Sequence, residues 1–151
     1  MNITIASEAD MMMLGEKIGS LLRGGECIEL IGDVGSGKTT ITKGIAAGLS
    51  ISETVQSPTF TINRTYDSPS GIRLSHYDFY RLQDPGIMAN ELDDTLQDAN
   101  TTVVIEWGDV IRSVVPNDRL RITFSSPTET VRELSIVGAG ERSNRIVKAI
   151  T

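Results

Sequence analysis

Cysteine is almost absent from this sequence, since Cys27 is the only one among its 151 residues. A lone cysteine cannot form an internal disulfide, which fits a reducing compartment, and the apolar neighbours of Cys27 predict a small core residue. No apolar run approaches the roughly 20 residues that a membrane-spanning helix needs. Residues 1–10 also lack the basic start and apolar middle of a signal peptide. We therefore expect a cytoplasmic protein.

The chain also has no excess of positive charge. The chain has 14 lysines and arginines against 20 acidic residues, a net charge of −6 and a pI of about 4.8. The basic residues are scattered and form no stripe that could neutralise the phosphates of a nucleic acid, the main source of nucleic-acid affinity. If the protein serves a nucleic-acid pathway, we expect it to act through protein partners. The remaining composition, 39% hydrophobic and 23% charged residues, predicts one folded domain over residues 1–151.

The order of apolar and polar residues predicts alternating strands and helices. An apolar strand at residues 26–31 leads into a glycine-rich loop, and a helix at residues 38–49 follows. Strand-like segments at residues 61–66 and 72–78 flank a strong turn signal, which predicts a hairpin. Further strands are expected at residues 2–6, 101–106, 119–124 and 131–137. Further helices are expected at residues 7–22 and 141–150, and one or two short helices at residues 85–97. This order is typical of an α/β fold: a P-loop NTPase domain with a mixed β-sheet flanked by helices.

The glycine-rich loop carries the strongest motif in the chain. Gly32, Gly37, Lys38 and Thr39 match the phosphate-binding pattern G-x-x-x-x-G-K-[ST]. Glycines let the backbone bring its N–H groups against phosphate oxygens, and the following helix adds the positive end of its dipole. We expect Lys38 to reach the β- and γ-phosphates and the Thr39 hydroxyl to bind magnesium. The predicted nucleotide-binding residues of this segment are Gly32, Asp33, Val34, Gly35, Ser36, Gly37, Lys38, Thr39 and Thr40.

A P-loop needs an acidic residue at the end of a nearby buried strand, where it holds magnesium directly or through water. Glu106 follows three apolar β-branched residues and fits that place, although an ordinary exposed strand end would have the same pattern. Trp107 comes next. On the residues alone it could equally be a core aromatic, and its place beside Glu106 favours a residue that lines the site.

Two more segments carry candidate side chains. In an alternating strand His76, Asp78 and Tyr80 share one face, so Asp78 could orient the attacking water or support the metal. The alternative is a polar strand face that pairs with its neighbours, and a lone histidine is usually structural. Thr59 lies in the loop after the P-loop helix, where a threonine of many nucleotide switches senses the γ-phosphate through magnesium. The alternative there is an ordinary turn.

Taken together, these motifs resemble the TsaE family, the bacterial ATPases required for threonylcarbamoyladenosine modification of tRNA. The matching segments are residues 32–40, residues 57–60 (Ser-Pro-Thr-Phe), residues 76–82 and residues 105–107. Many ATPases share the P-loop alone, whereas the combination in this order and spacing is specific.

The resemblance implies that Thr39 and Glu106 coordinate magnesium and that Thr59 belongs to a switch-like loop. It also implies functional roles for Asp78 and Trp107. The implied ligands are ATP or ADP with Mg²⁺, and the implied partners are TsaB and TsaD, of which TsaD transfers the threonylcarbamoyl group to adenosine 37 of tRNA. In this family the ATPase binds that pair and resets it between turnovers, so tRNA is acted on indirectly.

The adenine pocket is where the sequence departs from the family. Relatives often carry a threonine in the first helix near the base, and this chain has Met11, Met12 and Met13 there. Arg132 is the remaining candidate for a nucleotide contact, near the base or the phosphates.

These residues support one mechanism and leave two alternatives. Lys38 offsets charge on the β/γ oxygens, and Asp78 or a water that it orders assists hydrolysis. We expect weak hydrolysis by the protein alone, because no arginine finger is evident beside the site. The main alternative is a small-molecule kinase of the P-loop class, although residues 90–117 lack the clustered arginines of a lid. The second is an interaction module that holds ADP without turnover.

Overall fold

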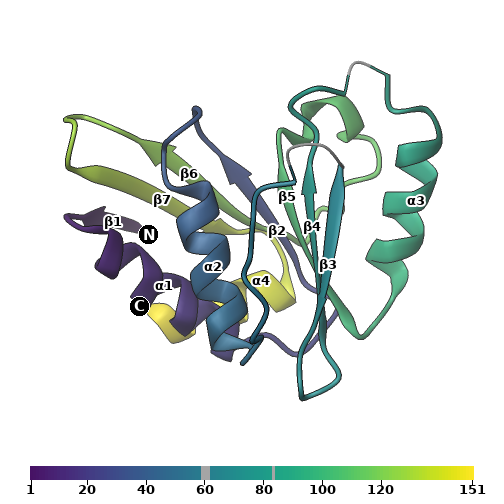
Figure 1. Cartoon of the computed structure of the whole chain (residues 1–151), viewed down its shortest axis with the longest axis horizontal. Coiled ribbons are helices and arrows are strands. Elements are labelled where there is room, and N and C mark those ends of the chain that lie inside the picture. The colour runs from purple at the N-terminus through teal and green to yellow at the C-terminus, as the bar shows by residue number, and fades with distance from the viewer. Residues whose placement is uncertain (59–61, 83) are drawn as a thin grey trace.

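The computed structural model of the chain describes residues 1–58, 62–82 and 84–151. These residues form a seven-stranded sheet in the order β1-β7-β6-β2-β5-β4-β3 (Figure 1). The strands are β1 (Asn2–Ile5), β2 (Cys27–Ile31), β3 (Asn63–Asp67), β4 (Arg73–Asp78), β5 (Thr101–Glu106), β6 (Leu120–Ser125) and β7 (Arg132–Gly138). The helices are α1 (Glu8–Ser20), α2 (Lys38–Gly48), α3 (Gly86–Gln97) and α4 (Glu141–Ile150), with a short 3-10 turn η1 (Gly108–Ile111). None of the described helices is long and apolar enough to cross a membrane.

The sheet is mixed. Strands β4, β5, β2 and β6 run parallel, while β3 at one edge and β7 and β1 at the other pair antiparallel to their neighbours. The ends of the elements lie within one or two residues of the positions predicted from the sequence. The predicted α/β fold with a mixed sheet flanked by helices is therefore confirmed.

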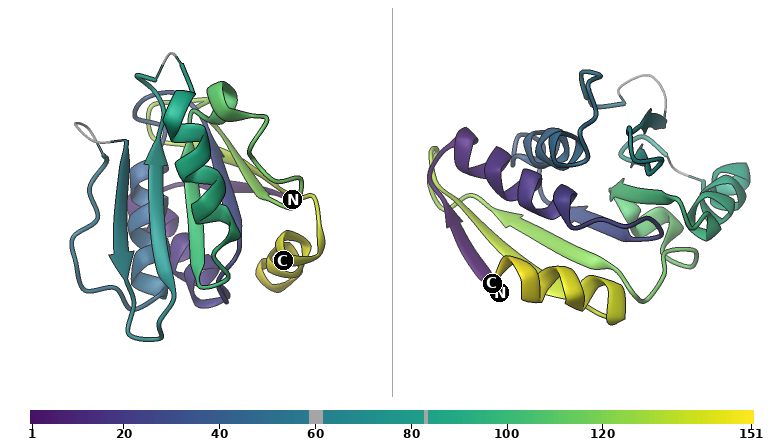
Figure 2. Two further views of the ribbon diagram at one scale, coloured as in Figure 1. Left: turned by 90° about the vertical axis from the view of Figure 1, so that its right-hand side faces the viewer. Right: turned by 90° about the horizontal axis from the view of Figure 1, so that it is seen from below.

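Two apolar clusters cover the two faces of the sheet. Because side chains alternate along a strand, Leu74 and Val104 face one cluster while Tyr77 and Val103 face the other. The first cluster contains residues of α1, α2 and α4, and the second contains Leu92 of α3. Figure 2 shows α3 beside the β3–β4–β5 part of the sheet, away from α1 and α2. Cys27 is buried in the second cluster, as its sequence context predicted.

Helices α1 and α2 touch backbone to backbone. A Cβ atom on Gly44 would lie 2.8 Å from the Cα of Gly15, and a Cβ on Gly19 would lie 2.2 Å from the carbonyl oxygen of Ile45 and 3.0 Å from the Cα of Gly48. Real Cβ contacts are essentially never that short, so only glycine fits at these crossings. The close packing fixes α2, and with it the loop before α2, against α1.

Candidate functional site

Three adjacent parallel strands end at the same edge of the sheet, and each delivers part of the site. Strand β2 continues into the glycine-rich loop, β5 ends at Glu106, and β4 ends at Asp78. The strand register pairs Glu106 with Leu30 on one side and with Asp78 on the other. In open α/β sheets ligands bind at the carboxyl ends of the strands, which is where these residues meet.

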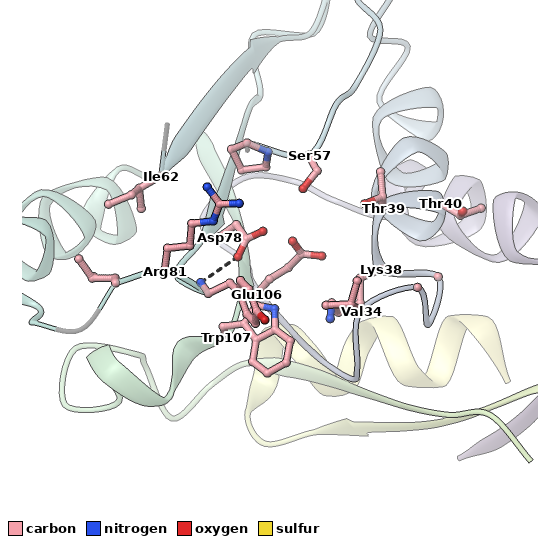
Figure 3. A pocket seen from close by; sticks show the side chains of 15 residues that line it. Val34, Lys38, Thr39, Thr40, Ser57, Ile62, Asp78, Arg81, Glu106 and Trp107 are labelled. Carbon is pink, nitrogen blue, oxygen red and sulfur yellow. Dashed lines mark hydrogen bonds between the residues drawn. The ribbon is translucent and has the colours of Figure 1, made fainter. Parts of the chain in front are cut away.

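A cavity of about 610 Å³ opens at this edge, and we call it the phosphate cavity. Figure 3 shows Lys38 and Thr39 on one side of it and Asp78, Glu106 and Trp107 on the other. The predicted site residues that line it are Val34, Gly35, Gly37, Lys38, Thr39, Thr40, Asp78, Glu106 and Trp107. Thr59 falls outside the described residues, so its role stays a prediction.

A second cavity of about 240 Å³ lies beside the same loop, and we call it the base cavity. Its lining includes Met11 from α1, Arg132 from β7 and Ser36 from the loop. The structure thus brings Met11 and Arg132 together next to the glycine-rich loop, although they are far apart in the sequence. One guanidinium nitrogen of Arg132 donates to the carbonyl oxygens of Thr128 and Glu129, at 3.3 and 3.0 Å, which ties the side chain to the β6–β7 loop.

The loop backbone adopts conformations that require glycine. Gly35 and Gly37 have φ values of +79° and +110°, in the left-handed region that side chains disfavour. A Cβ on Gly32 would lie 2.7 Å from the hydroxyl oxygen of Ser36. Gly37 is the N-cap residue of α2, so the first N–H groups of that helix face the loop and lack partners within the helix. Such an arrangement forms an anion site, because free N–H groups and the helix dipole converge on it.

Lys38 is held inside this loop. Its ammonium group donates to the carbonyl oxygens of Gly32 and Asp33, and it lies 4.6 Å from the centre of the Trp107 ring. Trp107 has φ +58° and ψ +47°, an uncommon conformation for a residue with a side chain. The Tyr80 ring packs on the same indole with a centroid distance of 5.0 Å. The aromatic pair therefore bounds the cavity where the lysine enters it.

The two carboxylates lie next to each other with little access to solvent. Glu106 is only 2% exposed, and Asp78 is half-buried. Burial raises the pKa of the Asp78 carboxyl, the backbone N–H of Tyr80 at 3.0 Å partly offsets this, and the charge of Glu106 raises it again. A carboxyl whose ionised form is disfavoured beside another carboxylate is suited to a nearby cation.

The oxygen donors present fit Mg²⁺. Thr39 offers a hydroxyl, and Glu106 offers a carboxylate across the same cavity. Mg²⁺ prefers oxygen ligands and usually takes only one or two from the protein, with phosphates and waters completing the octahedron. The described residues contain no group of three or more acidic, histidine or cysteine side chains that could hold a metal alone, and this kind of site needs none.

One sequence prediction about this region is wrong. Tyr80 does not share a strand face with His76 and Asp78, because β4 ends at Asp78 and Tyr80 lies in the following turn, 59% exposed. The next residue, Arg81, lines the phosphate cavity. Periodicity could not show this, because a turn after a strand redirects side chains in a way that alternation does not describe.

Comparisons with known proteins identify a family and support the fold. The family model described as "Threonylcarbamoyl adenosine biosynthesis protein TsaE" matches residues 5–134. Two similar proteins carry the name tRNA threonylcarbamoyladenosine biosynthesis protein TsaE. The one from Streptomyces coelicolor is 36% identical over 87% of this chain and 93% of its own, and the one from Bacillus subtilis is 35% identical over 84% and 78%. The crystal structure of YdiB from B. subtilis has a TM-score of 0.82 and 26% identity, and covers 99% of this chain and 93% of its own.

Proposed function

The chain belongs to the TsaE family, and we propose that it is a P-loop ATPase that acts with TsaB and TsaD in the threonylcarbamoyl modification of adenosine 37 in tRNA. The observation that carries the proposal is the meeting of three groups at one sheet edge. These are the glycine-rich loop with Lys38, the hydroxyl of Thr39 and the carboxylates of Asp78 and Glu106. A cluster of N–H donors, one cation and two carboxylates is what binding and hydrolysis of ATP with Mg²⁺ require.

The loop wall of the phosphate cavity binds the phosphates. Backbone N–H groups of residues 32–39 and the start of α2 donate hydrogen bonds to the phosphate oxygens. The Lys38 ammonium moves from the carbonyl oxygens of Gly32 and Asp33 to the β- and γ-phosphate oxygens. This exchange replaces the two carbonyl acceptors of the lysine with phosphate oxygens. Trp107 keeps water away from one side of the ammonium, which strengthens its attraction to phosphate.

The opposite wall supplies oxygen ligands and a proton acceptor. Thr39 and Glu106 would hold Mg²⁺, which when bound neutralises charge on the phosphate oxygens. Asp78 orients the attacking water or accepts its proton, a task helped by the raised pKa of its carboxyl. Thr59 is proposed to sense the γ-phosphate.

The base cavity is the proposed place for the adenine and ribose. It adjoins the loop at Gly35 and Gly37, so a nucleotide whose phosphates occupy the loop can extend into it. Met11 offers an apolar surface to the base, and Arg132 offers a cation toward the ribose and phosphates.

Hydrolysis by the protein alone is proposed to be slow. Arg81 lines the phosphate cavity, but its side chain is exposed and forms no hydrogen bond or ion pair with the rest of the described chain. A side chain without such anchors is not pre-organised to stabilise the charge of the transition state. TsaB and TsaD would fix the site when they bind. The acidic surface, with a net charge of −6, favours protein over tRNA as the contact, and the buried single cysteine fits the cytoplasm.

Phosphate release from ATP, measured with and without TsaB and TsaD, tests the proposal. We expect the protein alone to release phosphate slowly, and we expect TsaB and TsaD together to raise that rate at least tenfold. Binding of ADP without any turnover would favour an interaction module. Transfer of labelled phosphate to one of a panel of small-molecule acceptors would favour a kinase.

A further inference from the structure

The side chain of His76 is fully buried within the sheet beside Glu106. It lies in the middle of β4 with 0% exposure, and its Nε2 atom is 3.3 Å from Oε2 of Glu106. It is also the only histidine in the chain. The register explains the contact: His76 pairs with Val104 of β5, so it points to the same face as Glu106 two residues later.

Two neighbours of His76 on this face are apolar, while Arg64, opposite it on β3, is exposed. Leu74 on the same strand and Val104 on the next are both 0% exposed and belong to the first apolar cluster. Neither ring nitrogen has a well-aligned hydrogen-bond partner among the described residues. A buried polar group left in that condition destabilises the fold. An aliphatic residue would stabilise the fold better here, so folding stability does not account for the imidazole.

We propose that His76 is a positioning residue for Glu106. In this inference, which rests on the proposed function, Nε2 of His76 holds Oε2 of Glu106 and leaves the other carboxylate oxygen free for the cation. Groups that orient a metal-binding side chain in this way change metal affinity or activity by about 10–100-fold when removed. The close but unaligned contact becomes a hydrogen bond when the site binds nucleotide with Mg²⁺.

Three variants separate positioning from support of the fold. His76→Leu removes both ring nitrogens, His76→Gln restores an N–H donor near the position of Nε2, and Tyr77→Phe is the matched control. Tyr77 is the next residue on β4, is equally buried, and bonds through its hydroxyl to Thr95 at 2.9 Å on the opposite face. The control therefore loses a partly buried hydrogen bond on the same strand and leaves the contact with Glu106 intact.

The measured quantity is the affinity for ADP with Mg²⁺ and with a chelator. In His76→Leu we expect the gain in affinity that Mg²⁺ provides to fall at least tenfold, while affinity without the metal changes less than about twofold. His76→Gln should recover most of the gain, and Tyr77→Phe should keep all of it. The proposal would be overturned if Mg²⁺ raised the ADP affinity of His76→Leu as much as that of the wild type. It would also be overturned if His76→Leu and His76→Gln lost equal parts of that gain in affinity.

A measurement on the unaltered side chain covers the case in which His76→Leu fails to fold. Because the chain has one histidine, the ring nitrogen signals of ¹⁵N-histidine belong to His76 alone. We expect the Nε2 signal to shift when Glu106 is replaced in Glu106→Gln and when Mg²⁺ is added to the ADP-bound protein. A signal that is the same under both changes would contradict the contact.

The outcomes also separate this inference from the proposed function. If the wild-type protein bound no nucleotide, the proposed function would fail. If it bound ADP with a clear Mg²⁺ gain that did not depend on His76, only the positioning role would fail.

Discussion

The phosphate cavity has two walls built on opposite principles. The helix-pair wall consists of the glycine-rich loop and the start of α2. Helix α1 supports it from behind, where Gly15, Gly19, Gly44 and Gly48 bring the backbones of α1 and α2 into contact. The carboxylate wall consists of the ends of β4 and β5, where charged or polar side chains are buried against one another. The position of the first wall depends on close backbone packing, whereas the second wall acts through its charged side chains. Damage to the first should therefore unfold the protein or abolish phosphate binding, whereas damage to the second should spare the fold.

The largest effect should follow removal of Lys38, the charged group of the helix-pair wall that is proposed to bind the phosphates. Lys38→Ala should lower ATP turnover by about 10²–10³-fold, the usual loss when one pre-organised donor to a transition-state charge is removed. Phosphate release in the presence of TsaB and TsaD measures it. Lys43→Ala, on the exposed side of the same helix, is the control and should keep wild-type turnover. Wild-type turnover in Lys38→Ala would refute the site.

The next largest effect tests the spacing of the helices. Gly19→Ala places a Cβ 2.2 Å from the carbonyl oxygen of Ile45, so the helices must separate, at a cost of about 3 kcal/mol in the free energy of unfolding. Urea unfolding followed by circular dichroism measures this. Ala47→Gly, on the exposed face of α2, should cost only about 1 kcal/mol, through helix propensity. A loss in Gly19→Ala no larger than in that control would show that the helix crossing is not tightly constrained.

A smaller effect lies outside both walls, in the base cavity. Arg132→Ala should weaken ADP binding by about tenfold, or about 1.4 kcal/mol, because it removes a cation and frees the β6–β7 loop to which the guanidinium is tied. Isothermal titration calorimetry measures the dissociation constant. Arg112→Ala removes an exposed arginine paired only with Asp109, and its affinity should match the wild type. Equal ADP affinities in the wild type, Arg132→Ala and Arg112→Ala would indicate that the base does not bind in this cavity.

The smallest effect has the opposite sign. The fold raises the pKa of Asp78 above its ordinary value of 3.8, chiefly through burial, so the ionised form is less favoured in the folded than in the unfolded protein. Its stabilising contribution is therefore present below pH 3.8 and lost as the pH rises through the raised value. Asp78→Asn should make the protein more stable at pH 7, by less than about 1 kcal/mol because solvent screens a half-buried group.

The gain in stability of Asp78→Asn should vanish in acid, where the carboxyl of the wild type is protonated. Chemical unfolding at about pH 3 and at pH 7 measures the stability at both ends of this range. Asp94→Asn, an exposed position on α3, should show no gain at any pH. A variant Asp78→Asn that is less stable than the wild type at pH 7 would mean that the carboxylate wall supports the fold after all.

Local patterns were enough to predict most of one wall and part of the other. The loop motif, the strand before it and the place of Glu106 follow from short-range spacing, and the structure brings these residues to one cavity. The role of Gly15 and Gly44 was not predictable, because it depends on how two helices cross. The contact between His76 and Glu106 depends on the register of β4 against β5, which joins residues that are distant in the sequence. Turn geometry after β4 likewise decided where Arg81 lies.

The position of Trp107 has a practical consequence. It is the only tryptophan in the chain, and its indole lies against the ammonium group that the phosphates are proposed to engage. Excited at the red edge of protein absorption, the molecule emits almost entirely from this one ring. A nucleotide bound as proposed would change the charge directly beside this ring, so the fluorescence of Trp107 should report whether the site is occupied. Binding and release can be timed in a stopped-flow instrument without attaching a dye.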